Sequence, residues 1–291
     1  MELRKARKEV ASGREIFWQR ELAEAEVNAQ FNSLKGLFQG PSKVFDLTRW
    51  NLLLPVNKTI QLNTNHLALE IDTGWLNSGF RYIDPANWTQ KYFYLSTTNT
   101  MVFEAPWNGA RSTAGSGARS ELRGTLADGS EDNWTLAGTN TLEATCTVHV
   151  AGINDTNKLI IGQIYSKSAG SPSFAINYNF PSNKNVSVTY KLNPTNSLDN
   201  NLILATNVNL LDLIYYKVQL IDDGTNVSLH GEVRTNGVPY PPPLNVPLTT
   251  NPTNAWHSAT FYFKAGCYYP NYPTNGTAKV TFSSLDARHG P

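Results

Sequence analysis

The sequence predicts an all-β sandwich of about 250 residues that follows a helical N-terminal extension. From Val44 onward, short runs rich in Val, Ile, Thr, Tyr and Phe alternate with clusters of Asn, Gly, Pro, Asp and Ser, which is the pattern of strands joined by turns. No helix-length periodic segment lies among these runs, apart from a possible turn at 202–213. With 40% hydrophobic residues among 291, the chain can bury a full core, and the uniform composition favours one sandwich over two domains.

Residues 1–41 differ in kind from the rest of the chain. Lys, Arg, Glu and Ala dominate them, and apolar residues recur at steps of three and four, as on one face of an amphipathic helix. We expect one long helix, or two shorter helices that break at Ser12-Gly13. The chain is therefore divided into a helical N-terminal extension, 1–41, and a β-sandwich domain, 42–291. Packing of the helix on its own domain is favoured over a targeting or oligomerising role.

Ten segments of the second part have the composition of strands. They are 67–72, 100–105, 120–125, 141–150, 159–165, 173–179, 185–192, 214–221, 228–233 and 257–268. The Pro-rich stretch 238–247 is expected to be a loop between two strands.

Charge and composition exclude several classes of function. The 24 Lys and Arg against 23 Asp and Glu give a formal net charge of +1, so no global field draws the protein onto nucleic acid or an anionic membrane. No apolar run approaches the roughly 18 residues of a membrane span. The sequence has only two cysteines, Cys146 and Cys267, with 120 residues between them, so no metal site is expected. The sequence leaves open whether the two cysteines form a disulfide bond or remain free buried thiols.

Three of the predicted strands carry polar side chains two residues apart, which places those side chains on one face of each strand. The strands contain RSELR, IIGQIYS and YFKAGCY, and the side chains are Arg119, Glu121, Arg123, Gln163, Tyr165, Tyr262, Lys264 and Tyr268. An Arg-Glu-Arg row alone is typical of a salt-bridge ladder on a solvated face. Taken together, the three strands predict a groove for an acidic polysaccharide, in which cations bind uronate carboxylates and aromatic rings contact the sugars. Gly266, inside the third strand, predicts that some group approaches its backbone closely.

These segments resemble the three motifs of polysaccharide lyase family 7, the alginate lyases. RSELR, QIY and YFKAGCY occur in the order of that family, after WNLLLPVN and the Gly/Ser-rich TAGSGA. The resemblance spans roughly 45–282 and does not cover the N-terminal helix. It implies a β-jelly roll and a lyase that acts on alginate.

The resemblance also implies the roles of the catalytic residues. Arg119 and Gln163 would bind and neutralise the substrate carboxylate at the cleavage point, and Tyr268 would be the catalytic phenol. The chemistry makes the same demands, because the C5 proton of a 4-linked uronate is very weakly acidic until the adjacent carboxylate is neutralised. A phenol of ordinary pKa about 10 is a poor base at neutral pH, but flanking Arg and Lys would lower that pKa. Tyr268 could then remove the proton and return one to O4.

The remaining polar residues are expected to bind substrate. Arg123 and Lys264 would hold neighbouring uronates, Glu121 would orient the two arginines by charge-assisted hydrogen bonds, and Tyr262 would contact the polymer. No metal or organic cofactor is implied, because side chains neutralise the carboxylate. Alginate is the expected polymer, with glucuronan or another cell-wall polyuronate as the alternative.

Tyr165 departs from the family, which has His at this position. Either Tyr165 is a second phenolic acid/base or a hydrogen-bond donor, with Tyr268 alone carrying a syn-elimination, or the site is impaired and the protein binds its polymer without cutting it. A second departure is Pro270, where the family usually has Gln as a substrate contact. With the His absent, Ile164 does not indicate a preference between uronates.

Two other functional interpretations compete with that of a lyase. Glu70-Ile71-Asp72 resembles the start of the family 16 glycoside hydrolase motif, but the second Glu that retaining hydrolysis needs is missing. A lectin-like jelly roll would tolerate Tyr for His, yet binding alone does not require the full set of polar residues.

We expect a monomer with no nucleic-acid or membrane partner. An extracellular location is expected, although MELRKARKEV does not form a secretory signal.

Overall fold

The fold was analysed on a computed structural model of the chain. The structure describes residues 40–57, 68–78, 82–83, 91–111, 117–151, 157–168, 170–180, 183–194, 199–240, 243–248, 254–270 and 275–290. Gly40–Pro291 forms one compact unit. The expected helical extension lies almost entirely outside the described residues, so the division at residues 41 and 42 stays a prediction.

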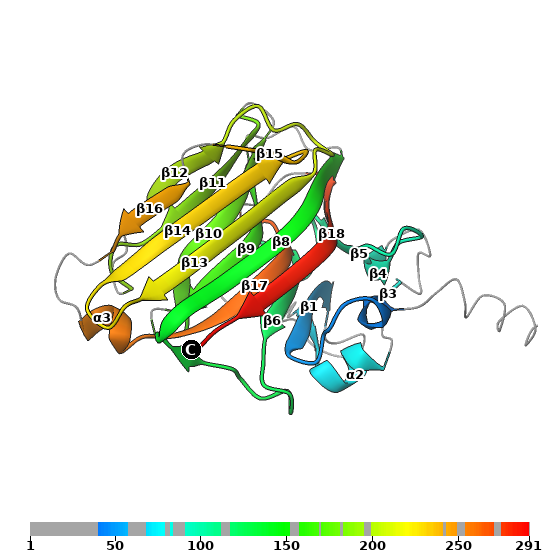
Figure 1. Ribbon diagram of the computed structural model, residues 1–291. Helices are drawn as coiled ribbons and strands as arrows, with labels where there is room; N and C mark the ends of the chain where they lie inside the picture. Colours follow the sequence, from blue (N-terminus) through cyan, green and yellow to red (C-terminus); the bar gives the residue numbers. More distant parts are fainter. Residues whose placement is uncertain are drawn as a thin grey trace, which may run out of the picture. The chain divides into compact units, whose positions relative to one another are not determined.

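Two antiparallel β-sheets pack face to face in this unit (Figure 1). In spatial order the first sheet contains β12 (Asn200–Ala205), β11 (Asn185–Tyr190), β10 (Ser171–Phe180), β9 (Asn157–Ser166), β17 (Thr260–Tyr268), β6 (Arg119–Gly124), β1 (Trp50–Asn57) and β2 (Ala68–Ile71), with β7 (Trp134–Thr135) paired to β17. The second sheet contains β15 (Val238–Pro239), β14 (Val227–Thr235), β13 (Ile214–Asp222), β8 (Gly138–Ala151), β18 (Thr277–Arg288), β5 (Met101–Pro106), β4 (Lys91–Leu95) and β3 (Tyr82–Ile83), with β16 (Leu244–Pro247) paired to β14. The expected all-β sandwich is confirmed.

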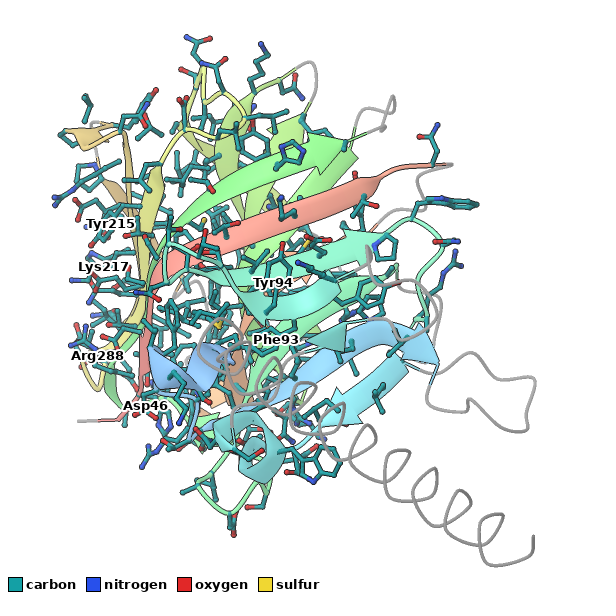
Figure 2. All side chains as sticks on the ribbon, turned by 90° about the vertical axis from the view of Figure 1, so that its right-hand side faces the viewer. Asp46, Phe93, Tyr94, Tyr215, Lys217 and Arg288 are labelled. Atoms are coloured by element: carbon teal, nitrogen blue, oxygen red, sulfur yellow. The ribbon has the colours of Figure 1, made fainter. Side chains whose placement is uncertain are left out.

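The core lies between the sheets and is built by alternation along each strand. On β13, the even-numbered residues from Ile214 to Leu220 are buried, whereas Tyr215 and Lys217 lie on the outer face of the second sheet (Figure 2). The hydroxyl of buried Tyr216 crosses the core and donates a hydrogen bond to the carbonyl of Ile161 at 3.1 Å. Because a strand has a side-chain period of two, one apolar face on each sheet suffices to specify this packing.

Both cysteines face this interior as free thiols. Burial raises the pKa of Cys146 to about 12 and that of Cys267 well above its usual value. Of the two alternatives that the sequence left open, the structure therefore has the free thiols.

The ten predicted strands correspond to strands of the sandwich, but the sequence missed several others. Part of the stretch 202–213, expected as a turn, belongs to β12, an edge strand with Leu202 and Ile203 exposed. The stretch 238–247 is not only a loop, because β15 and β16 both pair with β14. β12 and β15 have no alternating buried face. In β16 only Leu244 and Val246 face the core, which is too short a run to reveal a strand in sequence.

Two short helices were also missed. In α2 (Thr73–Asn77), the carboxylate of Asp72 caps the first turn by accepting a hydrogen bond from the Trp75 N–H at 2.9 Å. The helix α3 (Asn254–His257) replaces the start of the strand expected from 257. No helix in the described part of the chain is long and apolar enough to cross a membrane.

Candidate active site

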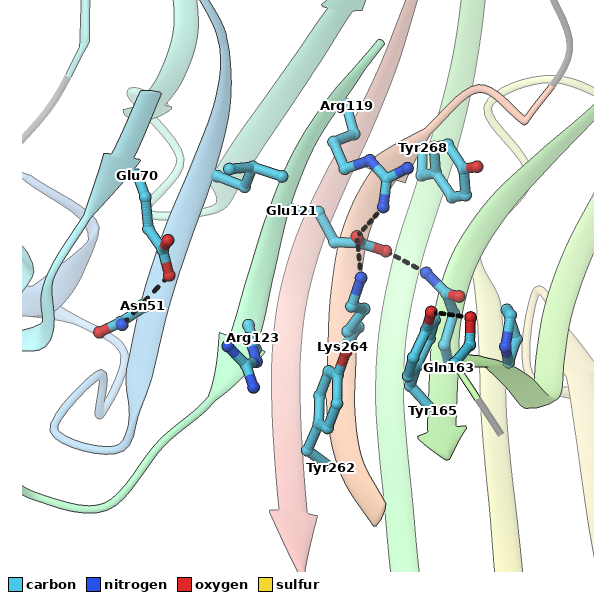
Figure 3. Close-up of a pocket in the computed structure, with 13 residues that line it drawn as sticks. Asn51, Glu70, Arg119, Glu121, Arg123, Gln163, Tyr165, Tyr262, Lys264 and Tyr268 are labelled. Carbon is cyan, nitrogen blue, oxygen red and sulfur yellow. Dashed lines mark hydrogen bonds and ion pairs between the residues drawn. The ribbon is translucent and has the colours of Figure 1, made fainter. Parts of the chain in front are cut away.

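A groove of about 520 Å³ lies on the outer face of the first sheet. All eight site residues predicted from the sequence line it (Figure 3), together with Asn51, Leu53, Glu70, Gly170 and Pro172. The register of β6, β17 and β9 explains this convergence. Lys264 on β17 is opposite Arg123 on one side and Gln163 on the other, and Tyr268 is opposite Arg119.

At the centre of the groove, the carboxylate of Glu121 is surrounded by three donors, which we call the inner cluster (Figure 3). Arg119 Nη1 lies 3.5 Å and Lys264 Nζ 3.4 Å from Glu121 Oε2, and Gln163 Nε2 donates a hydrogen bond to Glu121 Oε1. Glu121 is only 2% exposed and Lys264 8%. A buried carboxylate is tolerated only when it is paired and hydrogen-bonded, and these donors supply both conditions.

The inner cluster keeps an excess of positive charge, because two cations share one carboxylate. Burial lowers the pKa of Lys264, and the charge of Glu121 acts in the opposite direction. Among the described residues, Arg119 Nε and Gln163 Oε1 are buried without a hydrogen-bond partner. Polar atoms left unpaired beside a groove are available to a ligand.

Below the inner cluster, three side chains from neighbouring strands form a stack. The rings of Tyr165 and Tyr262 are stacked with centroids 5.0 Å apart, and the guanidinium carbon of Arg123 lies 4.3 Å from the centroid of Tyr262. Lys264 Nζ is 4.9 Å from the centroid of Tyr165. The aromatic rings thus hold two cations at the floor of the groove by cation–π contact.

Tyr165, for which the sequence resemblance predicted a departure from the family, uses its hydroxyl inside the protein. The hydroxyl donates a hydrogen bond to the carbonyl oxygen of Gly170 at 2.5 Å (Figure 3). Burial raises the pKa of Tyr165, and it raises the pKa of Tyr262 well above its usual range. In both residues burial favours the protonated phenol over the phenolate.

Tyr268 lies at the other end of the site, against Arg119. The guanidinium carbon of Arg119 is 3.7 Å from the centre of the Tyr268 ring, and Ile160 and Ala175 form an apolar cluster with the ring. Arg119 thus touches both the ring of Tyr268 and the carboxylate of Glu121. This contact places a positive charge beside the phenol that the sequence singled out.

Gly266 allows β17 to approach β6 closely between Lys264 and Tyr268. Its φ is +152°, and a Cβ built there would lie 2.5 Å from the carbonyl oxygen of Ser120 and 2.7 Å from the Cα of Glu121. The register between β17 and β9 shifts at this point, which marks a bulge. The close backbone approach that the sequence predicted at Gly266 is present.

Gly266→Ala is expected to lower the free energy of unfolding by about 2 kcal/mol or more, because the methyl group meets backbone atoms that cannot move aside. Urea denaturation of the variant measures this loss. Gly237→Ala is the matched control, since Gly237 has φ +81° but nothing within 4 Å of its Cβ position. If both variants lose the same free energy of unfolding, then backbone strain at positive φ, and not the close approach of β6, accounts for the cost of Gly266→Ala.

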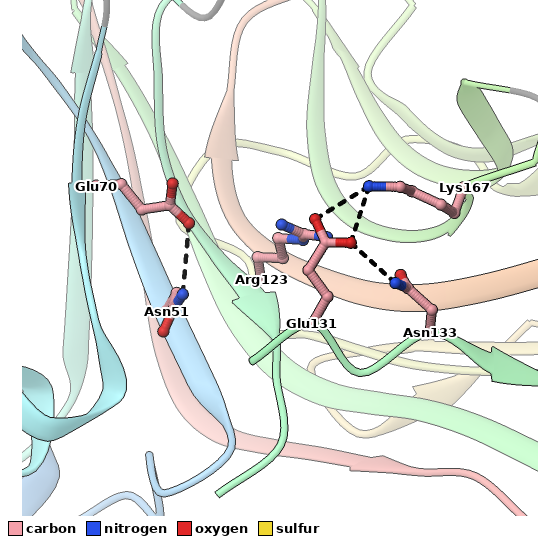
Figure 4. Close-up of polar contacts among 6 residues, drawn as sticks. All are labelled: Asn51, Glu70, Arg123, Glu131, Asn133 and Lys167. Carbon is pink, nitrogen blue, oxygen red and sulfur yellow. Dashed lines mark hydrogen bonds and ion pairs between the residues drawn. The ribbon is translucent and has the colours of Figure 1, made fainter. Parts of the chain in front are cut away.

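The sequence did not reveal a second polar cluster at the end of β6, shown in Figure 4. There, Glu131 contacts Arg123, Lys167 and Asn133. Glu131, Asn133 and Lys167 lie in connections between strands, where no periodicity relates them to the groove.

Asn51 and Glu70 line the far side of the groove and form a hydrogen bond of 3.4 Å (Figure 4). Asn51 lies in WNLLLPVN, a segment that already contributed to the family resemblance.

The histidines do not line the groove in the described part of the chain. His149 and His230 lie on β8 and β14 of the second sheet, and His230 Nε2 is 3.0 Å from Ser228 Oγ. Within the same residues, no group of three or more His, Cys, Asp and Glu could hold a metal ion. Pro270, where the family usually has Gln, is not among the lining residues.

Comparison with known proteins was made on both sequence and fold. The family model described as alginate lyase matches residues 45–289. An alginate lyase of Klebsiella pneumoniae is 32% identical over 154 residues, which are 44% of this chain and 47% of that protein. The match thus spans about half the length of this curated relative.

Solved structures match over nearly the whole sandwich. Alginate lyase PA1167 from Pseudomonas aeruginosa superposes with a TM-score of 0.67 at 25% identity, over 84% of this chain and all of that one. Alginate lyase A1-II', a member of polysaccharide lyase family 7, has a TM-score of 0.65 at 26% identity, over 86% of this chain and 99% of that one. The fold of the sandwich is the jelly roll of these alginate lyase structures. Because the family match covers most of the sequence, this chain belongs to the alginate lyase family.

Proposed function

We propose that this protein cleaves alginate by β-elimination and leaves an unsaturated uronate at the new end. The observation that carries the proposal is the arrangement of Arg119 between the inner cluster and the ring of Tyr268, 3.7 Å from its centre. A polyuronate lyase needs positive charge at the substrate carboxylate and a proton-transfer group beside it, and this pair supplies both.

In this mechanism, Arg119 and the amide of Gln163 bind the carboxylate at the cleavage point. An amide has two N–H donors, so Gln163 can donate one to Glu121 and still offer the other to substrate. Withdrawing charge from the carboxylate makes the C5 proton more acidic. Arg119 then also stabilises the negative charge that develops during proton removal.

Tyr268 is proposed as the group that removes the C5 proton and later protonates O4. The same phenol can perform both steps only when proton and leaving group lie on the same side of the ring, which is a syn-elimination. This geometry suits mannuronate and glucuronate. We therefore expect polymannuronate to be cleaved in preference to polyguluronate.

Tyr165 is proposed to act as a hydrogen-bond donor rather than as a second base. Its hydroxyl is engaged by Gly170 and burial raises its pKa. The ring keeps Tyr262 and Lys264 in place along the groove. Arg123, Lys264 and Tyr262 would contact the neighbouring sugars, and we further propose that the protein acts outside the cell as a monomer.

The test incubates the purified protein separately with polymannuronate, polyguluronate and glucuronan and follows the ultraviolet absorbance of the unsaturated uronate product. A rise with polymannuronate supports the proposal, and a rise with glucuronan alone would reassign the substrate. Retained polymer binding without any rise would instead mean that the site with Tyr165 binds its polymer without cutting it.

Alkaline pH is expected to weaken substrate binding, because the pKa of Lys264 is lowered by burial. Lys264 carries its charge below this lowered pKa and loses it as the pH rises through it, so the groove then holds one cation fewer. KM for polymannuronate should rise with pH before free lysines titrate. Lys264→Arg is the control, because Arg stays charged throughout. An identical pH profile for this variant would show that another group is responsible.

A further inference from the structure

Glu131 anchors a second cluster of charges at the edge of the groove, which we call the outer cluster (Figure 4). Its carboxylate lies 2.8 Å from Arg123 Nη2 and accepts hydrogen bonds from Lys167 Nζ at 2.8 and 3.0 Å and from Asn133 Nδ2 at 2.9 Å. These contacts lower the pKa of Glu131 to about 2, with the hydrogen bond from Lys167 as the largest cause. The carboxylate is therefore ionised at any pH at which the protein functions.

The outer cluster repeats the composition of the inner one. In each, one Glu carboxylate is shared by one Arg, one Lys and one side-chain amide. The two glutamates lie in different environments, since the side chain of Glu121 is 3% exposed and that of Glu131 is 43% exposed. Two cations against one carboxylate leave each cluster with a formal charge of +1.

Arg123 connects the outer cluster to the groove. It lines the groove and lies over the ring of Tyr262, whereas Glu131 and Lys167 stand behind it and are not lining residues. A carboxylate paired with Arg123 alone would cancel its charge. Lys167 binds the same carboxylate through two contacts, so the outer cluster as a whole keeps a net positive charge. Arg123 can present that charge to an anionic ligand.

We propose that Lys167 is a specificity-determining residue of the groove, which acts through Glu131 to leave Arg123 free to bind a second uronate carboxylate. Two clusters of charge +1 along one groove suit a polymer that carries one negative charge on each sugar. The inference rests on the proposed polyuronate substrate. It adds that recognition extends to Lys167 at the start of the β9–β10 turn, beyond the residues that touch the sugar.

The experiment compares three variants in steady-state kinetics on polymannuronate. Lys167→Met leaves a charge of zero in the outer cluster and is expected to raise KM about threefold to fivefold, the scale of an exposed charge pair, with kcat almost unchanged. The double variant Lys167→Met/Glu131→Gln restores the charge of +1 and should return KM to the parent value. Glu131→Gln alone, at +2, should lower KM. These differences should shrink as salt is added.

Lys217→Met is the control, since it removes one charge from the outer face of the second sheet. If it raises KM as much as Lys167→Met does, net charge and not the outer cluster is responsible. If the double variant keeps the high KM of Lys167→Met, then Lys167 only fastens the turn to Glu131, and the proposal is overturned.

The proposed function and this inference fail in different ways. Should the parent protein cleave no polymer, the lyase proposal fails, and the same variants are compared by their Kd for polymannuronate, with the same order expected. Should the parent cleave polymannuronate while all variants share its KM, only the inference fails. A parent that neither binds nor cleaves any polyuronate would overturn both.

Discussion

Tyr268→Phe is expected to lower kcat on polymannuronate by about 10²- to 10⁴-fold, the contribution of a positioned acid/base group. The substitution removes only the hydroxyl. The ring that lies against Arg119, Ile160 and Ala175 remains, so the packing around Arg119 is kept. KM should change little, because in the proposed mechanism Arg119 and Gln163 hold the carboxylate. Product formation followed by absorbance, at saturating polymer, measures the effect.

Tyr165→Phe serves as the matched control for the same loss of a hydroxyl in the same groove. It removes the hydrogen bond to Gly170, and we expect kcat to fall by less than about tenfold, since no proton-transfer step is lost. If Tyr165→Phe loses most of its kcat while Tyr268→Phe stays active, then Tyr165 and not Tyr268 transfers the proton. Thermal unfolding of both variants shows whether either effect comes from misfolding.

Glu121→Ala is expected to destabilise the protein by about 3–5 kcal/mol, because it leaves buried cations without their counter-charge. Lys264 and Arg119 are 8% and 6% exposed, and both have Glu121 as an ion-pair partner. Gln163 also loses its acceptor. The variant should unfold at a lower urea concentration than the parent and should show no lyase activity.

Glu131→Ala is the control for this prediction, since it removes the corresponding carboxylate from the outer cluster. Its side chain is 43% exposed, so water can solvate the cations left behind, and the expected loss is at most about 1 kcal/mol. If both variants lose the same free energy of unfolding, then burial of the carboxylate does not determine how much its removal destabilises the protein. A loss below about 1 kcal/mol in Glu121→Ala would show that the inner cluster contributes little to stability.

Strand geometry alone predicts which polar side chains of each strand share a face. Arg119, Glu121 and Arg123 are two residues apart, and a strand needs no tertiary information to align them. What sequence spacing does not contain is the order of strands in the sheet. That order makes Lys264 a neighbour of both Arg123 and Gln163.

Other parts of the site depend on contacts that no local pattern encodes. Glu131 and Lys167 are far apart in sequence and meet only because β7 pairs with β17 beside β9. The hydrogen bond from Tyr165 to Gly170 depends on the path of the β9–β10 turn. The edge strands β12, β15 and β16 were missed for a related reason, since they bury too few side chains to show alternation in sequence.

The position of β17 between β9 and β6 determines when the groove can exist during synthesis. β17 supplies Lys264 and Tyr268 but is among the last strands to leave the ribosome, more than 90 residues after β9. Until then β6 can pair with β1 and β9 with β10, but no strand joins the two pairs. The pairings with β17 must be made across a long stretch of chain, which makes folding slow. A nascent or truncated chain therefore carries two halves of the groove without Lys264 and Tyr268, and the complete groove forms only when the sandwich closes.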